Sequence, residues 1–340
     1  MKTILVVFTG GTIGSSVEEH TISPDTGQQF RLLDLYQQHP ARAADISFIP
    51  LVPYVILSEN LMPAVWEKLI QAIDAVDKTT LDGIIVTHGT DTLAFTASML
   101  DLFYRCIDIP LLVVSSDYPL TDARANGLEN FHSAVEFIRQ RAEAGVFVPY
   151  KNQQHSMHIH LGRQLMSCLP LSSDFISVQQ KPYLHFTSQG FQQLHTKPAT
   201  VNQDLWPLKP VFSARILLIR PYPGLDYRQF NLQQVDAVLH DLYHSGTACE
   251  SAEWGAAYSL SHFMRTCAEN QIPVYLAPAI AAADAYASTQ ELVQQGAVFI
   301  WNTSLESAYV SLLLGFGNFQ DSQRRARLLQ SCCAISAIED

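Results

Sequence analysis

The chain has 340 residues, of which 48% are hydrophobic and 16% charged, so it can form sizeable cores. Its length favours about two domains. The formal net charge is −11 and no run or stripe of Lys and Arg stands out, which argues against nucleic acid or an anionic membrane as the main partner and favours a small molecule.

The first predicted strand, Ile4–Phe8, is a short apolar run that leads directly into "TGGTIGSS". The run is too short for the core of a secretion signal, only Lys2 precedes it with a charge, and a Gly pair follows it at once. No apolar stretch is long enough to span a bilayer. We therefore expect a soluble, cytoplasmic protein without a membrane partner.

Further buried strands and several helices are predicted along the sequence. Short runs rich in Val, Ile and Leu predict strands at Gly83–Thr87, Leu111–Val114, Ile216–Ile219, Ala237–Leu239, Val274–Leu276 and Val298–Trp301. Helical periodicity predicts helices over Pro63–Val76, Leu93–Tyr104 and Asn126–Arg141. Alternation of strands and helices indicates an α/β fold with a mostly parallel sheet flanked by helices on both faces.

The segment Thr187–Pro210 breaks this alternation, because it is polar, contains three prolines and has no clear period. We predict an interdomain linker over residues 191–212. It separates a larger N-terminal α/β domain over residues 1–190 from a smaller α/β domain over residues 213–340.

Neither the cysteines nor the histidines predict a metal centre. The six cysteines form no CxxC pair and are expected to be free thiols in a reducing compartment. His158 and His160 would share one face of a strand, but solvated or hydrogen-bonded histidines on an edge strand fit better than a metal pair. We expect no metal and no cofactor.

The first Gly-rich segment does not have the spacing of a phosphate loop. Gly10, Gly11 and Gly14 fit neither G-x-G-x-x-G nor the P-loop, no Lys follows, and the next residues read as a loop that could form a lid. Thr12 then has two interpretations. It either caps its own turn or serves as a nucleophile that a neighbour must activate.

A second polar segment, "HGTDT", follows the predicted strand Gly83–Thr87. Thr90 or Asp91 would be an ordinary N-cap of a helix that begins near Thr92. Both residues also lie at the carboxyl edge of a parallel sheet, where ligands bind. A hydroxyl and a carboxylate there could bind an amide and an ammonium group.

The combination of "TGGTIG", "LSEN" and "HGTDT" resembles the bacterial-type L-asparaginase family, whose members deamidate asparagine. Three later segments resemble it as well: "YPLTDARANGLEN", "VLHDLYHSGTA" and "NTSLESAYVSLLLG", the last similar to the family's final helix. The resemblance runs through nearly the whole sequence, and the layout is closest to the cytoplasmic type I branch.

The resemblance implies a role for each motif residue. Thr12 would be the nucleophile on a flexible loop and would form an acyl-enzyme, Thr90 would be the second essential hydroxyl, and Asp91 would hold the substrate ammonium.

Ser58, with Glu59 beside it, would hold the α-carboxylate and the ammonium group. Backbone N–H groups near the two threonines would form the oxyanion hole, which adds Gly11 and Gly89 to the substrate-binding residues.

Two groups of the family pattern are missing here. The position of the family's lid tyrosine falls near Ile22, and the counterpart of its lysine is Met166 or Ser167. Arg163 is close in sequence but cannot act as a base. Lys151 or Lys181 would have to reach the site by another path.

A third departure lies in the C-terminal loop. Thr247 stands where many relatives carry an asparagine that reaches toward a neighbouring subunit's substrate.

Three functions remain open at this stage. The first is an amidohydrolase acting on L-asparagine or a closely related amide. The second is a catalytically impaired homologue that binds an amino acid as a sensor or regulatory protein. The third is the amide-releasing subunit of a transfer-RNA amidotransferase, which we expect less because no extra N-terminal region precedes the first strand. The resemblance also implies a homodimer or homotetramer.

Overall fold

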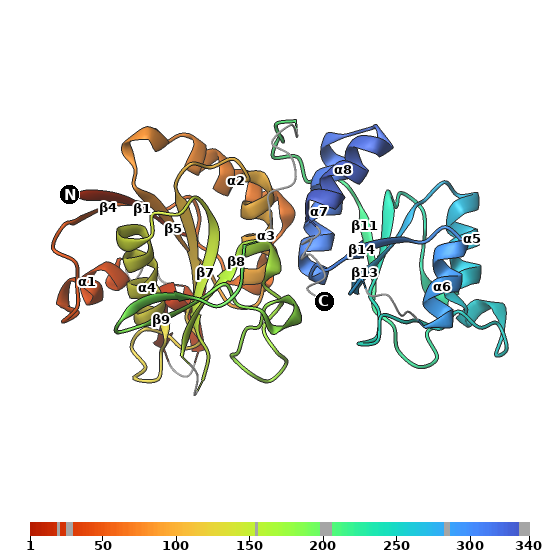
Figure 1. The fold of residues 1–340 in the computed structure, drawn as a ribbon, viewed down its shortest axis with the longest axis horizontal. Helices are drawn as coiled ribbons and strands as arrows, with labels where there is room; N and C mark the ends of the chain where they lie inside the picture. Colours follow the sequence, from red (N-terminus) through yellow and green to blue (C-terminus); the bar gives the residue numbers. More distant parts are fainter. Residues whose placement is uncertain (19–20, 25–29, 154–155, 198–205, 282–285, 333–340) are drawn as a thin grey trace. The chain divides into compact units, whose positions relative to one another are not determined.

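The computed structural model describes residues 1–340 except 19–20, 25–29, 154–155, 198–205, 282–285 and 333–340 (Figure 1). The protein divides into two compact units, Met1–Lys197 and Pro198–Asp340. Each unit has its own sheet, and the larger sheet belongs to the N-terminal unit.

The N-terminal unit is built on an eight-stranded sheet with the order β10-β9-β8-β7-β6-β5-β1-β4. The strands are β1 (Lys2–Phe8), β4 (Ile46–Leu51), β5 (Gly83–Thr87), β6 (Pro110–Val114), β7 (Gly145–Lys151), β8 (Met157–Leu161), β9 (Leu184–Thr187) and β10 (Gly190–Gln193). The strands from β4 to β7 pair in parallel, and those from β7 to β10 pair antiparallel. The predicted mostly parallel sheet is confirmed, with an antiparallel extension that the sequence analysis missed.

Helices cover both faces of this sheet. Figure 1 shows α1 (Arg31–Gln38) and α4 (Gly127–Gln140) on one side and α2 (Pro63–Asp74) and α3 (Leu93–Phe103) on the other. Ile4 and Val6 of β1 pack with Phe131 of α4, while the alternate residues Leu5 and Val7 are fully buried as well. Strands buried on both faces are the reason that the short apolar runs predicted them correctly.

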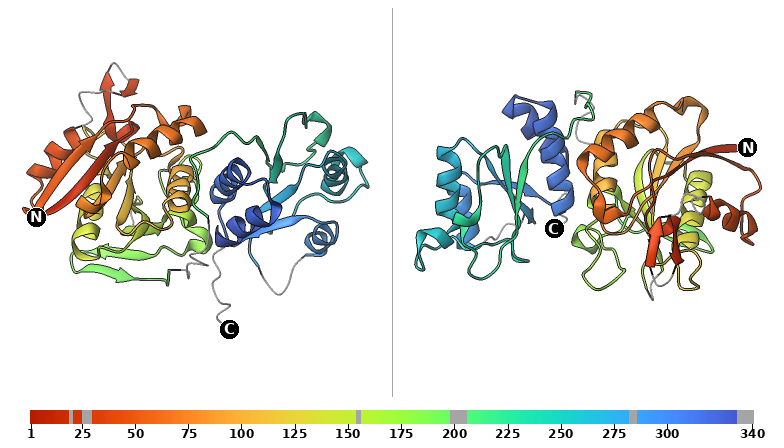
Figure 2. Two further views of the ribbon diagram at one scale, coloured as in Figure 1. Left: turned by 90° about the horizontal axis from the view of Figure 1, so that it is seen from above. Right: turned by 180° about the vertical axis from the view of Figure 1, so that it is seen from behind.

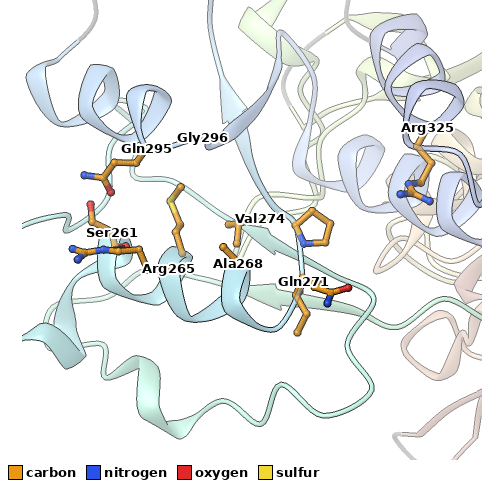
Figure 3. Close-up of a pocket in the computed structure, with 11 residues that line it drawn as sticks. Ser261, Arg265, Ala268, Gln271, Val274, Gln295, Gly296 and Arg325 are labelled. Carbon is orange, nitrogen blue, oxygen red and sulfur yellow. Dashed lines mark hydrogen bonds between the residues drawn. The ribbon is translucent and has the colours of Figure 1, made fainter.

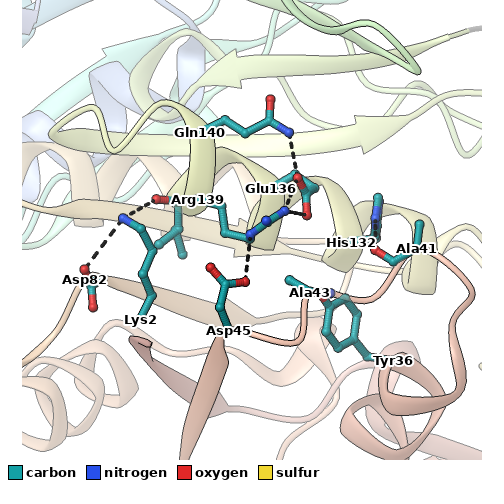
Figure 4. A network of polar contacts seen from close by, with 11 residues as sticks. Lys2, Tyr36, Ala41, Ala43, Asp45, Asp82, His132, Glu136, Arg139 and Gln140 are labelled. Atoms are coloured by element: carbon teal, nitrogen blue, oxygen red, sulfur yellow. Dashed lines mark hydrogen bonds and ion pairs between the residues drawn. The ribbon is translucent and has the colours of Figure 1, made fainter.

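A polar network ties the amino ends of the outer parallel strands to α4 (Figure 4). Lys2 Nζ donates to the carbonyl oxygen of Ile138 at 3.2 Å, and Arg139 Nε lies 3.2 Å from Asp45 Oδ1. Arg139 also pairs with Glu136 at 2.7 Å. These partly exposed pairs contribute little energy individually. These pairs lie at the amino ends of β1 and β4. The carboxyl ends of the same strands are therefore not occupied by this network.

Three details of the N-terminal unit correct the sequence analysis. The expected loop after "TGGTIG" is an antiparallel hairpin of β2 (Ser15–Glu18) and β3 (Thr21–Pro24). The predicted linker begins too early, because residues 190–193 form β10 and pair with β9.

The third correction concerns the histidines on β8, which lies between β7 and β9 and is not an edge strand. His160 is buried and its Nδ1 lies 2.7 Å from Ser177 Oγ, and burial lowers the pKa of His160 to about 3. His155 lies outside the described residues. Within the described ranges, no three His, Cys, Asp or Glu side chains gather as metal ligands would.

The C-terminal unit has a four-stranded parallel sheet in the order β11-β12-β13-β14 (Figure 2). The strands are β11 (Ile216–Ile219), β12 (Ala237–His240), β13 (Val274–Ala279) and β14 (Val298–Trp301), as predicted. One face packs against α5 (Leu260–Glu269) and α6 (Ala287–Gln294), and the other against α7 (Leu305–Asn318) and α8 (Ser322–Cys332). The segment predicted as the last helix is therefore α7, and a further helix follows it.

Two general expectations from the sequence are tested by this fold. The cysteines that the structure describes with their side chains are free thiols, as predicted: Cys106, Cys168, Cys249 and Cys267. Over the described part of the protein, no helix combines the length and the apolar character needed to cross a bilayer.

Candidate active site

The Gly pair after β1 brings two strand ends into backbone contact. Gly10 and Gly11 have φ values of +98° and +76°, a region that favours glycine. A Cβ atom at Gly10 would lie 2.3 Å from the carbonyl oxygen of Ile56, and one at Gly11 would lie 2.4 Å from Cα of Gly89. Any side chain at Gly11 would push the segment after β5 away from the segment after β1.

Ser58, in the segment after β4, and Asp91, in the segment after β5, lie at the same point. A Cβ atom at Gly89 would lie 2.4 Å from Ser58 Oγ, so these residues also touch. The Ser58 hydroxyl donates to Asp91 Oδ2 at 2.8 Å, and the Asp91 N–H donates to Ser58 Oγ at 3.3 Å. The structure thus brings together Gly11, Ser58, Gly89 and Asp91, which follow the carboxyl ends of β1, β4 and β5.

The two threonines both follow this contact point in the sequence. Thr12 comes directly after Gly11 and begins a single turn of 3-10 helix (Thr12–Gly14), and Thr90 comes directly after Gly89. Both threonines are half-buried. Glu59 is exposed and takes no part in the contacts that join Ser58 to its neighbours.

The predicted cap of α3 is wrong. The N-cap residue is Thr92, and its side chain makes no capping hydrogen bond. The Thr92 hydroxyl instead donates to the carbonyl oxygen of Ser58 at 3.0 Å, and the Asp91 carboxylate accepts the Ser58 hydroxyl. Asp91 is thereby directed to the strand ends instead of the helix.

The buried residue His88 holds the segment after β5 in place through hydrogen bonds. His88 Nδ1 lies 2.8 Å from the carbonyl oxygen of Gly89, and His88 Nε2 lies 2.9 Å from Thr96 Oγ1. Trp66 Nε1 donates to Thr96 Oγ1 at 2.9 Å. Every contact is satisfied by a neutral imidazole with the proton on Nδ1, and burial lowers the pKa of His88 to about 4. The sequence analysis did not assign His88 a role.

Beside these strand ends lies a pocket of about 270 Å³. Its lining combines residues after β5 and β6 with a loop of the antiparallel part of the sheet: Thr90, Asp91, Asp117, Ser167, Cys168, Leu169, Pro170, Leu171, Ser172 and Ser173. The Met166 N–H donates to the carbonyl oxygen of Ile176 at 3.0 Å and closes the base of the loop. Asn152 Oδ1 accepts from the N–H of Phe175 at 2.9 Å, and Asn152 Nδ2 donates to the carbonyl oxygen of Phe175 at 2.7 Å.

Of the two predicted counterparts of the family's lysine, Met166 and Ser167, only Ser167 lines the pocket. Ser167 lines the pocket together with Cys168. Burial, followed by the negative charges of Asp174 and Asp91, raises the pKa of Cys168 to about 11. The thiol is protonated at neutral pH and is a poor nucleophile.

The candidate replacements for the lysine lie elsewhere. Arg163 Nε is 3.2 Å from Asp101 Oδ2, and Lys151 Nζ is 2.6 Å from Glu129 Oε2. Lys181 is exposed and does not line the pocket. Among the described residues that line the pocket there is no Lys, Arg or His.

The other departures of the sequence have simple local structures. Ile22, at the position of the lid tyrosine, pairs with Val17 across the β2–β3 hairpin. In the C-terminal unit, Thr247 Oγ1 lies 2.8 Å from Ser245 Oγ, so the Thr247 hydroxyl has a partner in its own loop.

The C-terminal unit holds a wider cavity, of about 750 Å³, beside α5 and the start of β13 (Figure 3). Its described lining contains Ser261, Met264 and Arg265 but no carboxylate, histidine or cysteine. This cavity offers no side chain for acid–base chemistry near pH 7. The pocket of the N-terminal unit is therefore the candidate active site.

Residues 3–198, more than half of the sequence, match the family described as "Asparaginase, N-terminal". The chain belongs to this family of amidohydrolases, and the resemblance noted in the sequence is confirmed.

Individual relatives agree with the family. L-asparaginase 1 of Escherichia coli K12 is 27% identical over 251 residues, which cover 73% of this chain and 72% of the relative. The D subunit of the glutamyl-tRNA(Gln) amidotransferase of Methanococcus maripaludis C7 is 28% identical over 238 residues, which cover 66% of this chain and 55% of that relative.

Solved structures show the same fold. The thermostable L-asparaginase of Thermococcus kodakarensis superposes with a TM-score of 0.76 at 21% identity and covers 96% of both proteins. L-asparaginase I of Vibrio cholerae gives a TM-score of 0.76 at 21% identity and covers 97% of both.

Proposed function

We propose that the protein hydrolyses the side-chain amide of L-asparagine, or of a closely related amide, to a carboxylate and ammonia. The observation that supports this most is the contact of Gly11, Ser58 and Gly89 beside a pocket lined by Thr90 and Asp91. The proposal gives a function to Thr12 and Thr90. Each directly follows one of the two glycines, Gly11 and Gly89, whose backbones are in contact.

In the proposed reaction Thr12 Oγ attacks the amide carbon. The C–N bond then breaks, and ammonia leaves with the proton of the hydroxyl. Water next splits the Thr12 ester, which releases the carboxylic acid and restores the threonine. Backbone N–H groups near Thr12 and Thr90 stabilise the oxyanion, a contribution of about 3 kcal/mol per donor in other enzymes.

Substrate binding in this proposal uses the strand-end carboxylate. Asp91 holds the ammonium group, Ser58 holds polar groups of the substrate together with Glu59, and Thr90 assists proton transfer. A volume of about 270 Å³ suits a single small amino acid. Assembly as a homodimer or homotetramer and a cytoplasmic location are part of the proposal, and sedimentation of the purified protein tests the first.

The test is ammonia release by the purified protein from asparagine, glutamine and small amides. Glutamine is included because the amidotransferase relatives are named for a glutamine-linked reaction. The Thr12→Ala, Thr90→Ala double variant is the background, and the Thr12→Ser variant is the matched control that keeps a hydroxyl. If the unmodified protein releases no more ammonia than the double variant, the proposal fails.

A second function is favoured by one observation, the lack of any Lys, Arg or His among the described residues that line the pocket. General acid–base assistance typically contributes about 10²–10⁴-fold, so its loss could leave a protein that binds an amino acid as a sensor. Calorimetry separates the two functions. Tight binding of asparagine or aspartate without turnover supports the sensor, and turnover at ordinary enzyme rates removes it.

A further inference from the structure

The peptide group between Gly89 and Thr90 has a fixed orientation at the edge of the pocket. Its carbonyl oxygen lies 2.8 Å from His88 Nδ1, and its N–H belongs to Thr90, which lines the pocket. The peptide bond is trans, so the C=O and the N–H point to opposite sides of the group. A hydrogen bond to the Gly89 carbonyl oxygen therefore also sets the direction of the Thr90 N–H.

The Thr90 N–H has no acceptor within the described part of the protein. Nearby N–H groups of the same segment do have acceptors. The His88 N–H donates to the carbonyl oxygen of Val114 at 2.8 Å, and the Asp91 N–H donates to Ser58 Oγ at 3.3 Å. Backbone N–H groups that are shielded from water need a partner, so the Thr90 N–H is available to an acceptor atom of a ligand.

A series of buried hydrogen bonds decides which nitrogen of His88 carries the proton. Trp66 Nε1 can only donate, and it lies 2.9 Å from Thr96 Oγ1. The Thr96 hydroxyl then directs its own hydrogen to His88 Nε2, which is 2.9 Å away. Since His88 Nε2 accepts, the proton of the neutral imidazole is on Nδ1 and is donated to the carbonyl oxygen of Gly89.

This Trp66–Thr96–His88 series runs in one direction, from two helices to the peptide group. Trp66 belongs to α2, Thr96 belongs to α3, and His88 follows β5. All three residues are buried, so water does not compete for these bonds, and each bond polarises the next. A carbonyl oxygen that accepts such a bond draws charge from its own amide, which makes the Thr90 N–H a stronger donor.

We propose that His88, held by Thr96 and Trp66, is a positioning residue that aims and polarises the Thr90 N–H toward the oxygen anion of the reaction. The inference rests on the proposed function, in which that anion forms when the amide carbon is attacked. His88 does not line the pocket and exchanges no proton with the substrate. Its effect should be confined to the transition state, because the substrate oxygen gains charge only there.

The test compares two amide side chains at position 88. Asn places an amide nitrogen where His88 Nδ1 lies, so His88→Asn keeps the donor to Gly89. Gln is longer and places its amide nitrogen near the position of Nε2, so His88→Gln loses this donor. Removal of one oxyanion donor typically lowers kcat by about 10²–10³-fold, and misdirection of a donor that is still present should cost less, about 10–100-fold in His88→Gln.

Ammonia release under steady-state conditions gives kcat and KM for each variant. KM should stay within about twofold in both variants, because the interaction is made in the transition state and not in the bound substrate. In His88→Asn, kcat should stay within about threefold of the unmodified protein. A residue with a merely structural role would change KM as well and would not distinguish Asn from Gln.

The second matched pair is at position 96. Thr96→Ser keeps the hydroxyl between Trp66 and His88, whereas Thr96→Val removes it with little change of shape. Without the hydroxyl the His88 proton is no longer directed to Nδ1, so kcat should fall about tenfold in Thr96→Val at unchanged KM. Thr96→Ser should behave like the unmodified protein.

A further measurement follows the Thr90 amide without any turnover. Aspartate, the product of asparagine hydrolysis, carries a carboxylate oxygen where the substrate has its amide oxygen. It is titrated into isotope-labelled protein, and the amide proton signal of Thr90 is followed by NMR. We expect this signal to move downfield in the unmodified protein and in His88→Asn, and to move much less in His88→Gln.

Two outcomes overturn the inference: His88→Gln keeps both kcat and the Thr90 response of the unmodified protein, or His88→Asn loses as much as His88→Gln. If His88→Gln fails to fold, the pair at Thr96 decides by the same criteria. If no ammonia is released but the Thr90 signal responds as expected, the proposed function fails and the positioning role stands. If asparagine is hydrolysed at a rate independent of His88 and Thr96, the positioning role fails and the proposed function stands.

Discussion

The two walls of the pocket are held in different ways. The first, which we call the strand-end wall, is Thr90 and Asp91 together with the segments that hold them in place (Gly10–Gly14, Ser58 and Gly89). Its backbone contacts are so close that a single added Cβ atom would disrupt them. The loop wall (Ser167–Ser173) contains Leu171, which is fully exposed at a φ of +58°. The strand-end wall therefore permits little change, whereas the loop wall can exchange side chains, including a lysine for a serine, without altering the sheet.

The largest expected effect comes from Gly11→Ala in the strand-end wall. The new Cβ atom would meet the Gly89 backbone and adopt an unfavourable φ of +76°, which together should lower the free energy of unfolding by roughly 4 kcal/mol and abolish any ammonia release. Denaturant unfolding measures the first effect.

The matched control is Gly224→Ala, where φ is +83° and nothing lies within 4 Å of the added Cβ atom. This variant has the backbone strain without the collision, so about 1 kcal/mol is expected. Equal losses in both variants would show that the contact with Gly89 has no energetic importance.

An intermediate effect is expected from acid, through His88 beneath the strand-end wall. The pKa of His88 is about 4 in the folded protein against an ordinary 6.5, so the unfolded state binds more protons between these values. The free energy of unfolding should therefore fall as the pH drops through this window, by about 2 kcal/mol at pH 5 from this group alone.

Unfolding at pH 7 and pH 5 checks this in His88→Gln and in His244→Gln, which replaces an exposed histidine. On acidification the free energy of unfolding of His88→Gln should fall by about 2 kcal/mol less than that of the unmodified protein. His244→Gln should lose as much as the unmodified protein does. His160 and His240 are buried with lowered pKa values and add the same trend to every variant. An unchanged pH dependence in His88→Gln would contradict the role of the neutral imidazole.

The smallest expected effect concerns the loop wall. Leu171→Gly relieves a left-handed backbone and removes an exposed side chain, so the free energy of unfolding should rise by about 0.5 kcal/mol. Leu169→Gly, in the same loop but without positive φ, should instead lower it by a similar amount. Thermal unfolding of Leu171→Gly and Leu169→Gly measures both effects. A lower stability in both variants would mean that the backbone of Leu171 is not strained.

The parallel strands were predictable because they are buried on both faces and read as uninterrupted apolar runs, as Ile4–Phe8 does. Most of the missed strands lack this property, although β7 (Gly145–Lys151) was missed even with a buried interior. β4 contains Pro50 and is partly exposed at the sheet edge, and β8 alternates histidines with apolar residues. α8 was missed because its sequence, SQRRARLLQSC, is mostly polar.

The candidate site was predictable where its residues follow strands in a recognisable motif. Gly11, Ser58, Gly89 and Asp91 are of this kind, and the structure brings them together. Asp117 follows a strand as well, but its segment resembles ordinary turn sequence. Only the folded protein shows that it lines the pocket, because its orientation depends on hydrogen bonds to residues up to position 126.

The contact between Gly11, Ser58 and Gly89 also constrains how the protein folds. The three residues are separated by tens of positions, and each is placed only when β1 has paired with β4 on one side and β5 on the other. Parallel pairings of this kind are non-local and form slowly. The site is consequently complete only after β1 has paired with both β4 and β5, and no single segment of the sequence can form it alone.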